Sequence, residues 1–176
     1  MNDYTKGILT GASLILCFFM FVSANSQSKN LGDIVVNSVT VHNDRGEASV
    51  WIGLSPTGDG YLQTYNADGK KTSYLGTGGG RGGHLSTYNV NGTMTTYLGT
   101  SEGGGGHLNT WNTYGKETAY LGTGDGDGGN LATYNKYEKL VGYFGTGDNG
   151  ENIIQDGMAM LFDRYGDLGW SALGKK

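Results

Sequence analysis

The sequence predicts an all-β protein of tandem β-hairpin repeats, which form a β-solenoid or a twisted β-meander after an N-terminal signal or anchor segment. Three observations predict this fold. Two motifs recur every 23 residues, the residues within each repeat alternate with a period of two, and blocks of glycine separate the alternating segments. Collagen is excluded, because its glycine recurs at every third position beside abundant proline, whereas this chain has 34 Gly and 1 Pro.

The N-terminal segment, residues 1–24, has the features of a secretory signal peptide. Lys6 precedes a hydrophobic run over residues 8–22, which is shorter than the ~20 residues that a membrane-spanning helix needs. Small residues at 22–24 then offer a cleavage site after Ala24. We expect either cleavage there or an uncleaved anchor, followed by a linker over residues 25–38. Both alternatives place the remainder outside the cytoplasm: secreted, periplasmic or at the cell surface, or membrane-anchored where the segment is retained.

The rest of the chain, residues 39–174, is expected to form a domain of six repeat units with a period of 23 residues. A Tyr-Leu-Gly-Thr motif, once with Phe for Leu, recurs at residues 74–77, 97–100, 120–123 and 143–146. A second motif, Leu-x-Thr-Tyr-Asn, once with Trp for Tyr, recurs at residues 62–66, 85–89, 108–112 and 131–135. Degenerate copies flank these four units, as terminal repeats of a stacked array must present a different outer face.

Each unit has the sequence pattern of a β-hairpin. Residues 61–66 and 71–77 alternate with period two and are rich in β-branched and aromatic types, which suit strands. Between them, Asn66 can hydrogen-bond the turn's own backbone and Gly69 accepts a left-handed conformation, the chemistry of a type I turn closed by a glycine bulge. One unit has Glu138 at the glycine position, so we expect that turn to be strained or differently shaped.

The second strand of the unit is expected to place Ser73 and Leu75 on one face and Thr72 and Tyr74 on the other. The glycine blocks after it are interpreted as flexible connections into the next hairpin. Stacked units then align three ladders of like residues, which are Leu62, Leu85, Leu108 and Leu131; Tyr65, Tyr88, Trp111 and Tyr134; and Tyr74, Tyr97, Tyr120 and Tyr143.

A single sheet of this kind leaves one apolar face without cover. Two arrangements solve the problem. The hairpins coil into a solenoid around a narrow core or form a twisted meander, or chains associate, for example as a trimer that buries the Leu ladders along an axis. Small residues at one position suit close backbone approach in both arrangements; these are Ser73, Thr96, Ala119 and Gly142.

Little in the sequence indicates catalysis, and we expect no enzyme, no cofactor and no metal. After removal of Cys17 with the signal the chain has no cysteine, and it contains neither a Gly-x-Ser-x-Gly nor a phosphate-loop motif. The scattered net charge of −4 offers no basic surface for nucleic acid. Two weak metal hypotheses are a pair of histidines, His84 and His107, in adjacent units, and calcium at Asp125, Asp127 and Asp148.

The aromatic ladder suggests the one candidate ligand site. Exposed aromatic rings can stack against sugars, and the residues to test are Tyr65, Tyr88, Trp111 and Tyr134. The alternative interpretation is that these rings pack structurally across strands. We therefore expect a non-catalytic structural or surface-interaction repeat protein, with carbohydrate binding as the alternative function. Its expected partners are further copies of itself or a surface glycan, and it contacts a membrane only through an uncleaved N-terminal segment.

The repeat unit resembles that of a group of uncharacterised exported bacterial repeat proteins, whose unit of about this length has the pattern Leu-x-Leu-Tyr-Asp-x-x-Gly-Lys-x-Arg-x-x-Leu-Gly. Residues 62–70 followed by Leu75 and Gly76 match that pattern, and the similarity covers residues 39–174. This chain departs from it with Thr64 for the second Leu, Asn66 for Asp and Thr72 where Arg is usual. The resemblance implies an extracytoplasmic all-β repeat protein and brings no known activity. Shafts of phage tail fibres are similar more distantly, and the export signal speaks against that origin.

Overall fold

The computed structural model describes residues 2–25, 32–78, 81–124, 127–146 and 156–174, without the side chains of residues 21–25. Contacts divide the chain into two units, Met1–Val36 and Asn37–Lys176. The first contains helix α1 (Asp3–Asn25), where Asn2 Oδ1 accepts a hydrogen bond from the Thr5 amide in the manner of an N-cap. Among the described residues, no helix has both the length and the apolar character needed to cross a membrane.

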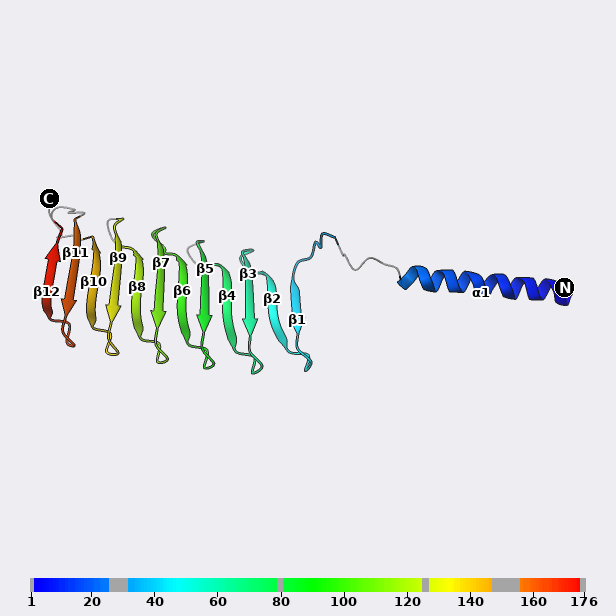
Figure 1. Ribbon diagram of the computed structural model, residues 1–176, viewed down its shortest axis with the longest axis horizontal. Helices are drawn as coiled ribbons and strands as arrows, with labels where there is room; N and C mark the ends of the chain where they lie inside the picture. The colour runs from blue at the N-terminus through cyan, green and yellow to red at the C-terminus, as the bar shows by residue number, and fades with distance from the viewer. Residues whose placement is uncertain (1, 26–31, 79–80, 125–126, 147–155, 175–176) are drawn as a thin grey trace. The chain divides into compact units, whose positions relative to one another are not determined.

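The described residues of the second unit form twelve β-strands in one antiparallel sheet, in which each strand pairs with its neighbours in sequence (Figure 1). The strands are β1 (Val39–His42), β2 (Ala48–Leu54), β3 (Gly60–Tyr65), β4 (Lys71–Thr77), β5 (Gly83–Tyr88), β6 (Met94–Thr100), β7 (Gly106–Trp111), β8 (Glu117–Thr123), β9 (Gly129–Tyr134), β10 (Leu140–Thr146), β11 (Gly157–Phe162) and β12 (Leu168–Leu173).

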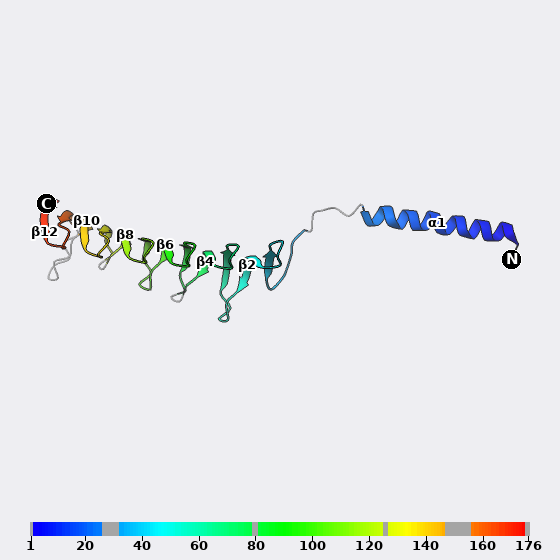
Figure 2. The ribbon, with the colours of Figure 1, turned by 90° about the horizontal axis from the view of Figure 1, so that it is seen from below.

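The sheet is an open meander, so the all-β hairpin prediction is confirmed and the solenoid alternative is not the one adopted. Figure 2 shows the strands following one another in a single layer. The connections that the structure describes in full are tight turns, and a tight turn returns the chain to the adjacent position in the same sheet. A solenoid needs segments that carry the chain around to a separate sheet. The described residues therefore leave both faces of the repeat sheet without a covering layer from that unit.

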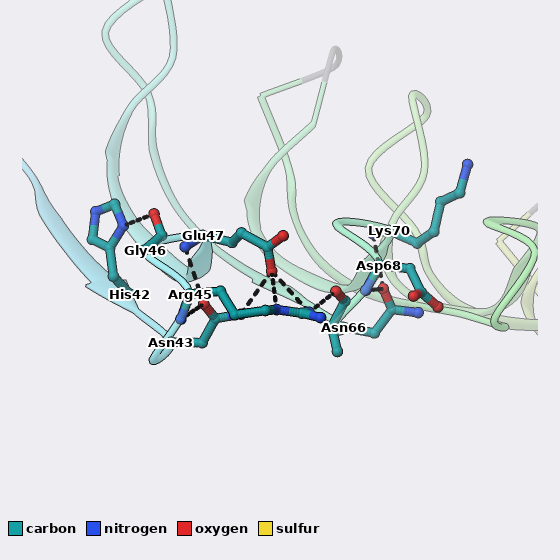
Figure 3. A network of polar contacts seen from close by, with 9 residues as sticks. His42, Asn43, Arg45, Gly46, Glu47, Asn66, Asp68 and Lys70 are labelled. Carbon is teal, nitrogen blue, oxygen red and sulfur yellow. Dashed lines mark hydrogen bonds and ion pairs between the residues drawn. The ribbon is translucent and has the colours of Figure 1, made fainter.

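Six turns at one end of the strands share the chemistry expected of Asn66 and Gly69. In each, the side-chain oxygen of an Asn or Asp accepts hydrogen bonds from the backbone amides two and four residues later, as Figure 3 shows for Asn43 and Asn66. The same bonds recur at Asn89, Asn112, Asn135 and Asp163. The Asx turn predicted from the sequence is therefore confirmed in every repeat. Neighbouring turns also touch, since Arg45 donates to the Ala67 carbonyl.

The glycine-rich connection over residues 101–105 forms a turn of the same kind, and the described ends of the connection over residues 78–82 are bonded in the same way. The Gly78 amide donates to the Gly82 carbonyl over 2.9 Å, and the Ser101 amide donates to the Gly105 carbonyl over 2.8 Å, repeating the bond between Asn66 and Lys70. In the connection over residues 78–82, the residue with the left-handed conformation is Arg81, with a φ of 64°. Sequence alone misses this because glycine permits such a turn without specifying it.

Two local expectations have different outcomes. Glu138 adopts a φ of 60° inside a turn of the usual hydrogen bonding, so the turn keeps its shape and carries the expected strain. Thr72 was expected on the face of Tyr74, but its hydroxyl lies 2.7 Å from that of Thr64, on the face of Leu62. A bulge between Thr64 and Tyr65 in the pairing of β3 with β4 causes the change.

Candidate functional site: the two faces of the sheet

One face of the sheet, here called the aromatic face, carries a continuous stack of six rings. The planes of neighbouring rings are within 20° of parallel, and their centroids lie 4.8 to 5.7 Å apart. The rings come from successive strands, in the order Tyr61, Tyr74, His84, Tyr97, His107 and Tyr120. The expected tyrosine ladder is therefore present, but residues of the intervening strands stand between its members and make it a close-packed layer.

The glycine of the Tyr-Leu-Gly-Thr motif makes room for this stack. Gly76, Gly99 and Gly122 lie opposite Tyr61, His84 and His107 in the strand pairing. A Cβ atom on Gly99 would stand 2.4 Å from the Cβ of His84 and 2.7 Å from the Gly83 carbonyl oxygen. No side chain fits at that distance, so the glycine is required by close packing and not by backbone conformation.

Each tyrosine of the motif is also tied to its own strand. The hydroxyl of Tyr74 donates to the carbonyl of Thr77 over 2.8 Å, and that of Tyr120 donates to Thr123 over 2.7 Å. The small residues between these tyrosines are the most deeply buried of the described chain, with Ser86 1% and Ala132 6% exposed. The buried core of the sheet is therefore the layer beneath the tyrosines.

The four candidate sugar-stacking residues lie in one line on this face and are half-buried. Two of the tyrosine hydroxyls turn back along their own strands, where Tyr65 donates to Gln63 Oε1 and Tyr88 lies 3.1 Å from Ser86 Oγ. Lys71 Nζ lies 4.2 Å from the ring centroid of Tyr88, a cation–π contact. The remaining members of the line are Trp111 and Tyr134. This arrangement resembles structural packing more than a row of open ring faces.

A shallow groove of about 410 Å³ lies beside one of these residues, Trp111. Met94 and Tyr97 supply further apolar lining, and Asn109 lines it with its Nδ2 donating to Glu117 Oε1 over 2.9 Å. The groove thus combines an indole with polar side chains. Its size and lining suit a small polar ligand.

Charge on the aromatic face is disfavoured at two positions. Burial lowers the pKa of His84 below 6.5, and the nearby Lys71 lowers it further. Burial also raises the pKa of Glu117, as does Glu138, while His107 opposes that rise. The face therefore favours neutral side chains, in keeping with a packed layer.

The histidine pair does not converge on a shared ion. The ring of Tyr97 stands between His84 and His107, with centroid distances of 4.8 and 4.9 Å to the two imidazoles. Among the described residues, no three His, Cys, Asp or Glu side chains are placed to hold a metal. Asp127 lies in a turn at the end of β8, whereas the other two calcium candidates, Asp125 and Asp148, lie outside the described residues.

The opposite face, here called the aliphatic face, carries an exposed apolar row. Leu62, Leu75 and Leu85 pair directly across β3, β4 and β5. Large side chains of the row are open to solvent, as with 54% of Leu98 and 52% of Leu121. The row runs along ten strands through Val39, Ile52, Leu62, Leu75, Leu85, Leu98, Leu108, Leu121, Leu131 and Phe144.

The ladder of leucines expected from the sequence contains only those of the first strands. Leucines of the second strand, such as Leu75 and Leu98, complete the row because the glycine turns make all neighbouring strands pair. These leucines recur in the Tyr-Leu-Gly-Thr motif, and that recurrence could have identified them as members of the row.

Small residues flank the apolar row on both sides. On one side, hydroxyls pair with one another, as Thr87 Oγ1 does with Thr96 Oγ1 at 2.7 Å. On the other side stands a glycine in every first strand after β1, where a Cβ atom would meet nothing within 4 Å; these are Gly60, Gly83, Gly106, Gly129 and Gly157. None of these five has a positive φ. Neither packing nor backbone conformation of the described chain explains their recurrence.

No protein-family model and no curated protein matches this sequence.

Proposed function

We propose that this chain is an exported structural or surface-interaction repeat protein that associates with copies of itself through the aliphatic face, without catalytic activity. The observation that supports the proposal is the row of half-exposed leucines from Leu62 to Leu131. Soluble monomers rarely expose contiguous apolar patches beyond a few hundred Å², and larger ones mark interaction sites. The open meander excludes burial of this row by a solenoid, which leaves association as the solution.

Repetition itself supports a structural role. An active site needs unique side chains that converge on one place, whereas here each repeat presents the same residues at the same register. Identical patches along the sheet instead give an extended surface, which suits assembly. Export remains a prediction from the N-terminal segment, and it agrees with a role outside the cytoplasm.

The test is the molar mass of the native protein, purified from cells that express the full chain. Sedimentation equilibrium should show an oligomer, and Leu98→Asn should weaken it, because a polar amide at the centre of the row must be desolvated on association. Val90→Asn is the matched control, since Val90 is 75% exposed but lies in an Asx turn away from the row. A monomeric native protein, or equal effects of both substitutions, would contradict the proposal.

Carbohydrate binding is the second candidate function, and the groove beside Trp111 favours it. An indole ring and polar side chains are the groups with which proteins commonly hold sugars. A glycan array probed with the native protein and with Trp111→Ala tests it, and Tyr88→Ala serves as a second aromatic variant. Binding that persists without Trp111, or none at all, would remove this candidate.

A further inference from the structure

We infer that three copies of this chain assemble with their aliphatic faces inward, as a triangular prism with the apolar row along its axis. This inference rests on the proposed self-association and adds the stoichiometry and the arrangement of the partners. It is carried by the sizes of the side chains across the aliphatic face, which run from small to large to small along every strand of the middle repeats.

The apolar row is too narrow for a dimer that packs two sheets face to face. Ten strands at about 4.8 Å each make the row roughly 50 Å long, and the rise of two residues makes it about 7 Å wide. The row therefore covers only about a third of the roughly 20 Å length of a strand, so a second flat sheet would meet it along one narrow strip. In a two-sheet packing, the five glycines beside the apolar row would also lack any side chain in contact with them, because sheets stack about 10 Å apart over their whole width.

The same pattern suits three sheets. A strand of six or seven residues is about 20 Å long, and a triangle with sides of about 20 Å has its centre about 6 Å from the middle of each side. One layer of leucine side chains spans about 5 Å, half the usual spacing between stacked sheets. Leucines in the middle of each strand, such as Leu85 and Leu98, therefore meet at the axis.

The corners of the prism explain the recurrent glycines. Near a corner two sheets converge, so only small side chains fit between them. One end of each first strand supplies glycine, as in Gly83, and the other end supplies Thr, as in Thr87. The second strands place Ser, Thr, Ala or Gly beside these threonines, as Ser73 does opposite Thr87. Glycines that face open space in a single chain are then required by the neighbouring chains.

The tightly packed aromatic face is thereby left on the outside of the prism. Gly78 and Gly82 line the groove with Tyr97 and His107, so these two turn residues lie toward the aromatic face and away from the proposed axis. On the side of the row away from the glycines, hydroxyls are already hydrogen-bonded to one another, as between Thr64 and Ser73 at 2.6 Å, so burial of these groups leaves them partnered.

Native mass spectrometry and sedimentation equilibrium of the protein from cells expressing the full chain test this inference. We expect a trimer. Gly106→Val should keep the circular dichroism of the sheet, because its side chain enters open space in one chain, yet weaken the trimer at least tenfold. Ala67→Leu, which adds as many carbon atoms at an exposed Asx turn, should leave the trimer unchanged. If Gly106→Val loses the sheet signal, Gly106→Ala takes its place, with a smaller weakening expected.

The outcomes separate the two proposals. A dimer that Leu98→Asn dissociates would overturn the prism and leave self-association standing. A monomer would overturn both. A trimer that tolerates Gly106→Val as well as Ala67→Leu would overturn the placement of the glycines at the corners, and with it the prism.

Discussion

The two faces of the sheet are made by the same strands, but their side chains are covered to different extents. On the aromatic face, six rings stack on one another over Ser86 and close the surface within one chain. On the aliphatic face, leucines such as Leu98 stand half-exposed. Rings can cover a sheet by stacking face to face along it, whereas short branched side chains need a second layer.

The glycines of the two faces make the same contrast. Gly99 is fixed by contacts inside its own chain, whereas Gly106 has open space around it. The aromatic face therefore stabilises a single chain, and we propose that the aliphatic face binds other copies of it. Four experiments can break or sharpen this comparison, beginning with the largest expected effect.

The sharpest comparison is between Gly99→Ala and Gly106→Ala. The first places a methyl group against His84 and the Gly83 carbonyl, so we expect it to lower the free energy of unfolding by about 2 kcal/mol or more. The second should change it by less than about 0.5 kcal/mol in dilute protein, as surface substitutions usually do. Urea unfolding at a concentration where the protein is dissociated measures both. Equal losses would mean that the two faces do not differ.

Removal of a tyrosine hydroxyl on the aromatic face should lower the free energy of unfolding by less than Gly99→Ala does. Tyr120→Phe removes the hydrogen bond to the Thr123 carbonyl, and we expect a loss of about 1 kcal/mol that does not depend on protein concentration. Leu121→Ala, on the opposite face of the same strand, should instead lower the thermal midpoint only at concentrations where the protein is associated. Concentration-independent loss with Leu121→Ala would contradict the assigned roles.

A turn outside both faces provides a stabilising control. Glu138→Gly relieves a left-handed conformation that costs a non-glycine residue about 1 kcal/mol, and it removes an exposed ion pair with Lys116 that contributes little. We expect a net gain of about 0.5 kcal/mol in the free energy of unfolding, measured by urea titration. The oligomeric state should not change, and a change would show that the turns take part in assembly.

The smallest effect concerns pH. Because the pKa of His84 in the folded chain lies below its usual 6.5, the unfolded chain binds protons more readily, and stability should fall as the pH decreases below about 6.5. His84→Asn should flatten this dependence, since Asn130 occupies the equivalent position in another repeat. Thermal unfolding at pH 7.5 and pH 5 measures it. The reverse change, Asn130→His, should steepen the dependence, and no difference between the two variants would contradict the assignment.

Much of the hairpin could be predicted from single residues. Asn66 and Gly69 specify a turn by local hydrogen bonding and backbone conformation, and the alternation over residues 71–77 specifies a strand. The candidate surfaces could be predicted only in part. Ladders of Leu62 and of Tyr74 follow from the period of 23, but their neighbours depend on which strands pair, and Arg81 gives no sequence signal for a tight turn. Thr72 changed face because a bulge shifts the register by one residue.

The sequence by itself determined the repeat, the strands, the Asx turns and the alternation of aromatic and aliphatic side chains, because each depends on neighbours within a few residues. Only the tertiary structure decided that the strands form one open meander, that His84 and Tyr97 share a stack, and that the leucines remain exposed. These features depend on contacts between strands, which local propensity does not encode. The proposed trimer would explain glycines such as Gly106 in the same way, by contacts between chains.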